Sequence, residues 1–247
     1  MTIKSAKQER IYREAGKISS EILRELGDNV KEGFTPLDIE KLAQDRCREF
    51  RVKPSFATVL GYDWATCISV NDCILHGIPN DIPFKEGDLV KIDFGIVYKG
   101  FSTDHCWTWA VGKVSDEDRI LMEAGREATE NGCKEAVAGN HTGDISHALR
   151  STAKRYGYTT LEEFAGHGIG KSLHDTPEIL SFGNPNTGEL LKDGMVICVE
   201  CQVTKSNDIY IGKNGWDVMS SDGFKGSMYE YMGIVRRDGF VKLTDSF

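Results

Sequence analysis

Three strongly apolar segments of this chain each contain a single carboxylic acid. Residues this apolar at consecutive positions are typical of strands that are covered on both faces. A carboxylate buried in such a strand is very costly unless it is paired, protonated or bound to a metal ion. One acid of this kind can face water at a sheet edge, but three together need a common explanation. The three acids are Asp93 in segment 89–97, Glu200 in segment 196–201 and Glu230 in segment 228–232.

A fourth acid, Asp104, is brought close to Asp93 by a predicted hairpin. A two-residue Lys99-Gly100 loop can close this hairpin. Asp93 and Asp104 then lie diagonally on one face, and Gly95 is expected to leave space between them. Two carboxylates so placed repel each other unless a cation or a proton lies between them. The pairs expected across the hairpin are Tyr98 with Phe101, Gly95 with Asp104, and Asp93 with Cys106.

Histidines in two further segments can complete a ligand set. The glycine-rich segment 166–170 contains His167 and precedes His174, and its glycines suggest a tight loop that brings a side chain close to a site. His76 stands in an apolar segment, where a lone histidine is more often a satisfied core residue. Carboxylates mixed with imidazoles suit Mn, Fe, Co or Zn better than Ca or Mg. Four acids with one or two histidines suffice for two ions.

Apolar periodicity and capping signals predict two helices followed by strands, and then the same order again. No Pro/Ser-rich linker separates the halves, so we expect residues 1–247 to form a single α+β catalytic domain of two similar halves that share a sheet. The expected helices are 7–26, one with Thr35 as N-cap and Pro36 as first residue, 115–137 and 142–156. The expected strands are 66–70, 89–98, 101–111, 195–204, 209–213, 228–235 and 240–243.

Charge and hydropathy exclude several classes of protein. The formal net charge of −8 disfavours a nucleic acid or an anionic membrane as the main partner. No apolar run approaches the roughly 20 residues that span a bilayer. Residues 1–12 lack the apolar stretch of a secretory signal. We therefore expect a cytoplasmic protein.

The seven cysteines are an odd number scattered over a long chain, which favours reduced thiols over a disulfide framework. Cys198 and Cys201 have the spacing of redox and zinc sites. They lie in a predicted strand, however, where residues three apart point to opposite faces. A shared metal or disulfide is therefore not expected.

A nucleotide-binding loop is an alternative interpretation of segment 165–172, which fits a relaxed P-loop pattern with Ala165 in the first glycine position. A P-loop needs a buried strand before it and a helix after it. Segment 160–164 is a poor buried strand, and Pro177 would end the following helix early. The pattern therefore disfavours a P-loop.

Taken in order, the polar residues resemble those of the type I methionine aminopeptidases, a family with the pita-bread fold. The resemblance covers nearly the whole chain. It implies hydrolytic removal of the initiator methionine when the second residue is small. The substrates would be the N-termini of nascent polypeptides at or near the ribosome, and the enzyme a cytoplasmic monomer. The matching motifs are His76 in HGIP, Asp93 and Asp104 eleven positions apart, His167 in GHGIG, His174 in HDTP, Glu200 and Glu230.

The resemblance also implies individual roles. Glu200 would transfer protons, and His76 and His174 would contact the substrate carbonyl or amide. Two divalent ions (Co, Mn, Fe or Zn) would be bound by Asp93, Asp104, His167, Glu200 and Glu230, with Asp104 and Glu230 bridging. The methionine side chain would lie among Tyr62, Cys67, His76, Leu173 and Trp216.

Four positions depart from the family pattern, but none removes a ligand. They bear on pocket shape and turnover rather than on the class of reaction. Related peptidases of the same fold, prolidase and aminopeptidase P, resemble longer chains with an added N-terminal domain. A non-catalytic homologue would usually have lost ligands. The departures are Cys201 for proline, Tyr231 for histidine, His105 for threonine or serine, and Leu173 for an aromatic residue.

Overall fold

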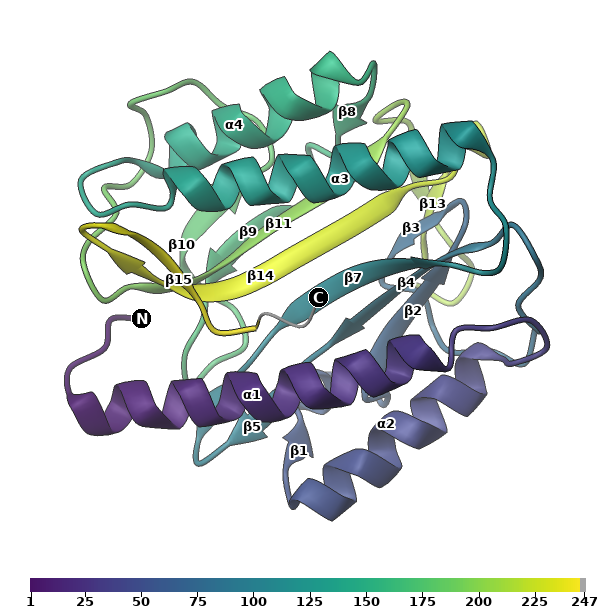
Figure 1. Ribbon diagram of the computed structural model, residues 1–247, viewed down its shortest axis with the longest axis horizontal. Coiled ribbons are helices and arrows are strands. Elements are labelled where there is room, and N and C mark those ends of the chain that lie inside the picture. Colours follow the sequence, from purple (N-terminus) through teal and green to yellow (C-terminus); the bar gives the residue numbers. More distant parts are fainter. Residues whose placement is uncertain (245–247) are drawn as a thin grey trace.

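The computed structural model describes residues 1–244 (Figure 1). Two helices followed by strands occur twice along the chain, as predicted. The helices are α1 (Ala6–Asp28), α2 (Pro36–Phe50), α3 (Asp116–Glu135) and α4 (Thr142–Arg155), with a short 3-10 helix η1 (Phe56–Thr58). The strands of the first half are β1 (Lys53–Pro54), β2 (Thr66–Val70), β3 (Cys73–Leu75), β4 (Leu89–Phe94), β5 (Ile96–Tyr98), β6 (Phe101–Ser102) and β7 (His105–Ala110).

The second half contributes eight strands. They are β8 (Thr159–Thr160), β9 (Ala165–Gly168), β10 (Asp175–Leu180), β11 (Val196–Thr204), β12 (Ile209–Ile211), β13 (Val218–Ser220), β14 (Ser227–Arg236) and β15 (Gly239–Lys242). Every ladder between these named strands is antiparallel. The largest sheet has the order β10-β9-β11-β14-β15, with β8 also paired to β11. The smaller groups are β2-β4-β7, β1-β5-β6 and β12-β13-β3.

Side chains near the helix starts fix where the helices begin. The Thr35 side chain accepts a hydrogen bond from the Asp38 backbone, and the Asp38 side chain accepts one from the Thr35 backbone. This reciprocal pair satisfies two amide groups that have no partner inside the helix. The predicted start of the second helix is therefore confirmed, with Pro36 as its first residue.

The two halves meet where β7 and β14 run side by side across the middle of the molecule (Figure 1). The Thr108 hydroxyl donates to the Met228 carbonyl at 2.7 Å and accepts from the Met228 amide at 2.9 Å. These side-chain bonds connect two strands that belong to different ladders. The strands of both halves therefore form one layer beneath the helices.

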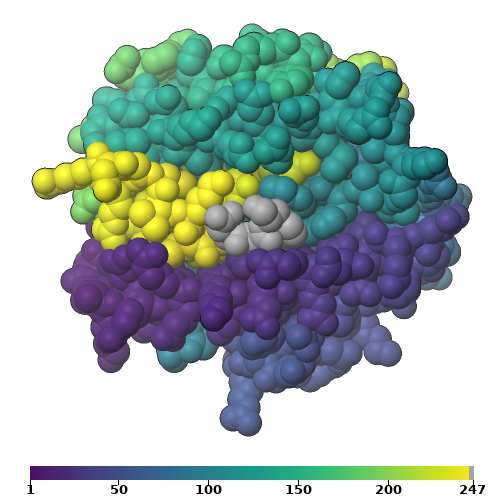
Figure 2. All heavy atoms as spheres, viewed as in Figure 1, coloured from purple at the N-terminus to yellow at the C-terminus, as the bar shows by residue number. Residues whose placement is uncertain are grey.

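The helices cover this layer in two pairs (Figure 1). Helices α3 and α4 pack on β11 and β14 through a core that includes Leu121, Leu149, Val199 and Tyr231. Helices α1 and α2 pack on the first half through Ile22, Ile39, Ile92 and their neighbours. Figure 2 shows the helix-bearing face, where β14 and β15 form a band between α1 and α3. No helix among residues 1–244 has both the length and the apolar character needed to cross a membrane.

The hairpin between the two aspartates has the predicted register. Tyr98 pairs with Phe101 and Asp93 pairs with Cys106, although each expected strand is split in two. The predicted role of Gly95 is wrong, because a Cβ at this position would lie 1.9 Å from the Thr103 carbonyl oxygen. The glycine makes room for a neighbouring backbone and not for space between carboxylates.

Candidate metal centre and active site

Every site residue predicted from the sequence lines one cavity of about 760 Å³. The polar group of the cavity lies at the junction of the two halves, because β4 and the residue before β7 face β9, β11 and β14. In the apolar group, Cys67 lies on β2 and the other three residues come from loops. The residues are Asp93, Asp104, His167, Glu200 and Glu230 with His76 and His174, and then Tyr62, Cys67, Leu173 and Trp216.

The four acids gather because three of them lie on β4, β11 and β14 and the fourth, Asp104, directly precedes β7, which lies between β4 and β14. Glu200 on β11 stands directly opposite Glu230 on β14. Carboxylate oxygens of Asp93, Asp104 and Glu230 lie within 4.8 Å of one another. One oxygen of each of these three acids is buried without a hydrogen-bond partner among residues 1–244. Oxygens in this state need a cation or a proton.

The electrostatics of the cluster lead to the same conclusion. Burial raises the pKa of Asp104 to about 7 and that of Glu200 to about 8. Burial and the charge of Asp104 raise the pKa of Asp93 and of Glu230 well above their usual range. Without a cation, the four groups therefore cannot all ionise near neutral pH. A divalent ion would restore the charged form that binds it.

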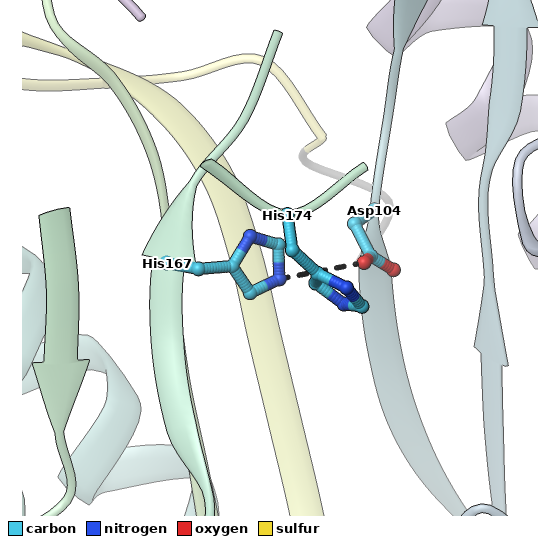
Figure 3. Close-up of side chains that lie close together, drawn as sticks. All are labelled: Asp104, His167 and His174. Carbon is cyan, nitrogen blue, oxygen red and sulfur yellow. Dashed lines mark ion pairs between the residues drawn. The ribbon is translucent and has the colours of Figure 1, made fainter. Parts of the chain in front are cut away.

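His167 supplies a nitrogen ligand to the same cluster (Figure 3). Its Nε2 lies 3.6 Å from Asp104 Oδ2 and 3.8 Å from Glu200 Oε1. Its Nδ1 lies 2.9 Å from the Gly168 carbonyl oxygen, which can only accept a hydrogen bond. Nδ1 is thus positioned to donate to this carbonyl, and Nε2 faces the carboxylates, where it can bind a metal ion. The donor set of buried carboxylates and an oriented imidazole fits divalent cations such as Mn, Fe, Co or Zn.

The glycine-rich segment does not begin as the expected tight loop, because residues 165–168 form strand β9. A Cβ on Gly166 would lie 2.5 Å from the Cys198 carbonyl oxygen, and one on Gly168 would lie 2.0 Å from that of Thr176. The glycines thus allow close approach of the strands on either side of His167. Between β9 and β10, residues 169–174 contain no helix, which contradicts the P-loop alternative.

Two further histidines flank the cluster. The His174 ring lies 4.5 Å from the His167 ring at 87° (Figure 3). Burial, with the charge of neighbouring histidines, lowers the pKa of His174 to about 4. Burial also lowers the pKa of His76, whose ring lies 5.4 Å from Phe164 in an edge-on contact. Both imidazoles are therefore neutral at pH 7, a state in which a ring can both donate and accept a hydrogen bond.

Aromatic rings form one wall of the cavity. The rings of Tyr62 and Trp216 meet edge-on, with centroids 4.9 Å apart. The Phe56 ring also meets Tyr62 edge-on, with centroids 6.4 Å apart. The Tyr62 hydroxyl donates to the Thr66 carbonyl at 2.7 Å, so the polar end of this ring is satisfied. The wall suits an apolar side chain.

Among the four positions that depart from the family pattern, only Leu173 lines the cavity. Cys201 and Tyr231 pack on the opposite face of their strands, under α3 and α4. His105 is buried behind the site, with Nε2 3.0 Å from the Ser19 hydroxyl. Cys198 packs in the cluster on the cavity side, so it and Cys201 point to opposite faces as predicted. All seven cysteines are free.

Several lining residues were not predicted from the sequence. Phe164 contacts His76, but it lies in a segment without helical or strand periodicity. Four acids, Glu162, Glu163, Asp175 and Glu178, also line the cavity and are exposed. Only contacts between distant segments identify these residues.

Residues 10–237 match the metallopeptidase family M24. The chain belongs to this family. Its place in M24 explains the buried acids, since a metallopeptidase uses divalent metal. This M24 chain is 34% identical to methionine aminopeptidase 1 of Bacillus subtilis (strain 168) over 242 residues, which is 98% of each chain. It is also 34% identical to the methionine aminopeptidase of Aquifex aeolicus (strain VF5), over 94% of each.

Solved structures place the M24 chain in the pita-bread fold. The crystal structure of methionine aminopeptidase from Thermotoga maritima matches with a TM-score of 0.96 and 33% identity, covering 99% of this chain and all of that one. Prolidase from Pyrococcus furiosus matches with a TM-score of 0.80 and 23% identity, and only 66% of its length is covered. The second likeness concerns the fold alone. The predicted α+β class and pita-bread architecture are confirmed.

Proposed function

We propose that this chain removes N-terminal methionine from polypeptides whose second residue is small, by metal-dependent hydrolysis. The observation that carries the proposal is the combination of orphaned buried carboxylate oxygens and an apolar, aromatic wall in one cavity. The full-length similarity to methionine aminopeptidases supports the same activity. The whole of residues 1–247 would act as one catalytic unit.

The five polar residues of the cluster would hold two divalent ions, with Asp104 and Glu230 shared between them. These ions would supply a water that is nucleophilic near neutral pH and would polarise the scissile carbonyl. A carboxylate-rich set accepts several metals, so Co, Mn, Fe and Zn are all candidates. The ligands are Asp93, Asp104, His167, Glu200 and Glu230.

Three side chains would carry out the proton and hydrogen-bond steps. Glu200 would accept a proton from the attacking water and deliver it to the leaving amine, as a general base and then a general acid. His174 and His76 would donate hydrogen bonds to the carbonyl or amide as negative charge develops on the oxygen. Their neutral state suits them to donate without repelling a nearby cation.

The methionine side chain would lie against the aromatic wall. Tyr62, Cys67, Leu173 and Trp216 offer rings, a sulfur and an aliphatic surface, which suit a long unbranched thioether. The side chain of the second residue would meet the rim of the cavity near His76. Leu173 replaces a rigid aromatic ring by a more flexible aliphatic side chain in one wall of the pocket. We therefore expect N-terminal Met to be preferred and Leu or norleucine to be tolerated.

The substrates would be N-termini of nascent polypeptides, at or near the ribosome in the cytoplasm, and the enzyme would act as a monomer. The negative net charge is consistent with binding a peptide without direct contact to nucleic acid. No further partner is required for the chemistry, because one chain supplies every residue named above.

The test is cleavage of the peptide Met-Ala-Ser with and without a chelator, followed by restoration with each of the four metals. We expect release of methionine that the chelator abolishes. A panel varied at the first two positions follows, in which Ala, Gly or Ser is accepted second and Lys or Phe is rejected. Faster release of N-terminal Pro or Arg than of Met would overturn the assignment.

A further inference from the structure

The loop that carries His76 is held by a strand outside the residues assigned above. Strand β3 pairs with β13 up to Leu75 and Val218. Beyond this pair the backbone ladder stops, and His76 adopts a left-handed conformation with φ of 56°. A non-glycine residue in this region is strained and persists only where its surroundings hold it.

Beyond the last backbone pair of β3 and β13, a side chain of the β13 segment, Asp217, provides the next hydrogen bond between the two segments. Its Oδ1 accepts a hydrogen bond from the Ile78 amide at 2.8 Å. The Asp217 side chain thus holds Ile78, two positions after His76, where β3 and β13 no longer pair. No backbone carbonyl of β13 provides this contact, because the chain has turned away at His76.

The opposite side of the same loop is fixed to β2. The Gly77 amide donates to the Ser69 hydroxyl at 2.9 Å, and the Gly77 carbonyl accepts from the Ile68 amide at 2.8 Å. A Cβ on Gly77 would lie 2.3 Å from the Ile68 carbonyl oxygen. Two anchors therefore clamp the residues after His76: β2 on one side and Asp217 on the other.

Asp217 also connects this loop to the aromatic wall. It follows Trp216, and the Asn214 side-chain oxygen accepts hydrogen bonds from both backbone amides, at 3.0 and 3.1 Å. Trp216 packs against Tyr62 in the aromatic wall. One short turn therefore presents a wall for the substrate side chain and tethers the loop that bears a catalytic histidine.

We propose that Asp217 is a positioning residue that keeps His76 in its left-handed conformation and links it to Trp216. This proposal rests on the proposed function, in which His76 contacts the substrate. Asp217 acts as a hydrogen-bond acceptor and not as a charge. An asparagine can therefore replace it, whereas alanine cannot.

The experiment compares Asp217→Ala, Asp217→Asn and the control Asp208→Ala on the peptide Met-Ala-Ser. Asp208 lies in the same hairpin region with an exposed side chain. Displacing a catalytic group by about 1 Å can cost on the order of 10²-fold in rate. We therefore expect kcat to fall about 10- to 100-fold in D217A and to stay within about threefold of the unchanged chain in D217N and D208A. Asp217→Val is a second variant without an acceptor, for use if D217A does not fold.

A double-mutant cycle with His76→Ala separates positioning from general damage. If Asp217 acts through His76, adding D217A to H76A lowers kcat by less than about twofold further. A full additional loss would overturn the proposal, and so would equal losses in D217A and D217N or unchanged kcat in D217A.

A measurement that does not depend on catalysis tests the positioning role of Asp217 separately from the proposed peptidase activity. The NMR signal of the His76 ring, assigned with H76A, should move in D217A and remain in place in D217N and D208A. A signal that stays in place in D217A would reject the tether. If the unchanged chain did not cleave Met-Ala-Ser, the proposed function would fail, while this signal would still test the tether.

Discussion

At the residue scale, the chain contains two kinds of buried acid. Glu40, only 2% exposed in α2, accepts hydrogen bonds from the Ala65 and Thr66 amides and from the Thr66 hydroxyl. Its carboxylate is satisfied by neutral donors and fixes the loop that enters β2. Asp104 and Glu230 are equally buried, but each keeps an oxygen without a partner among the described residues. Hydrogen bonding, and not burial, marks the acids available to a cation.

The same scale gives a prediction for Glu200. Glu200→Gln keeps the shape of the side chain but cannot accept and return a proton, so we expect kcat to fall by about 10²- to 10⁴-fold. Isothermal titration with Mn²⁺ should still detect metal, since four other ligands remain. The control is Glu163→Gln, the same chemical change at an exposed position of the cavity. Substantial turnover by metal-loaded E200Q would show that another group carries the proton.

At the element scale, strand alternation explains why so much of the site could be predicted. The even-numbered residues of β11 and β14, including Glu200 and Glu230, face the cavity side, and odd-numbered residues such as Val199 and Tyr231 face α3 and α4. An even-length turn fixed the pairing of Asp93 with Cys106 in the same way. The alternation of side chains along a strand and the number of residues in a turn are both local properties. They can therefore be read from a single sequence.

Other parts of the site depend on contacts that no local pattern encodes. Asp217 bonds to an amide 139 positions away, and Phe164 meets His76 from an irregular segment. The role of Gly95 was misjudged for the same reason, because the atom it avoids belongs to Thr103 on the neighbouring chain segment. Side-chain to backbone contacts of this kind appear only once the chain is folded.

A prediction at this scale concerns the ion pair that ties α1 to β14. Arg236 donates to Glu9 at 2.6 Å, and Arg13 donates to the other oxygen of Glu9. Hydrogen bonds from Arg13 and Arg236 lower the pKa of Glu9 below its ordinary value of 4.5. The ionised Glu9 therefore stabilises the folded state fully at pH values above its unfolded-state pKa. This stabilisation is lost as the pH falls through the lower folded-state pKa of Glu9.

Glu9→Gln should accordingly lower the free energy of unfolding by about 1 kcal/mol at pH 7 and by less at pH 3. Urea unfolding at both pH values measures the difference. Glu21→Gln, on the same helix and exposed, serves as the control and should change stability little at either pH. An equal effect of Glu9→Gln at pH 3 and pH 7 would mean that the charge of Glu9 does not contribute.

At the scale of the whole molecule, the acids of the cluster come from both halves. Asp93 and Asp104 belong to the first half, whereas His167, Glu200 and Glu230 belong to the second. Bound ions would therefore cross-link the halves and relieve repulsion among the carboxylates at the same time. Binding to the folded state alone stabilises it by mass action.

We expect the melting temperature to rise by about 5–10 °C when Mn²⁺ is added to chelator-treated protein at about 100 times its Kd. Differential scanning calorimetry measures the shift. Asp104→Asn should abolish most of it, and Asp208→Asn, at an exposed position, should leave it intact. Identical melting curves with metal and with chelator would contradict a metal centre in this cavity.

The division of the cluster between the halves also has a consequence for how the protein is made. Translation delivers Asp93 and Asp104 early and Glu230 only with β14, close to the end of the described chain. A copy that ends before residue 167 contains Asp93 and Asp104 but neither His167 nor Glu200, and a copy that ends before residue 230 still lacks one of the four buried acids. If the proposed metal ligands are right, peptide cleavage would begin only after β14 has been made and has packed beside β7, because Glu230 is the last of these ligands along the chain. A prematurely terminated product would be inert and not partially active.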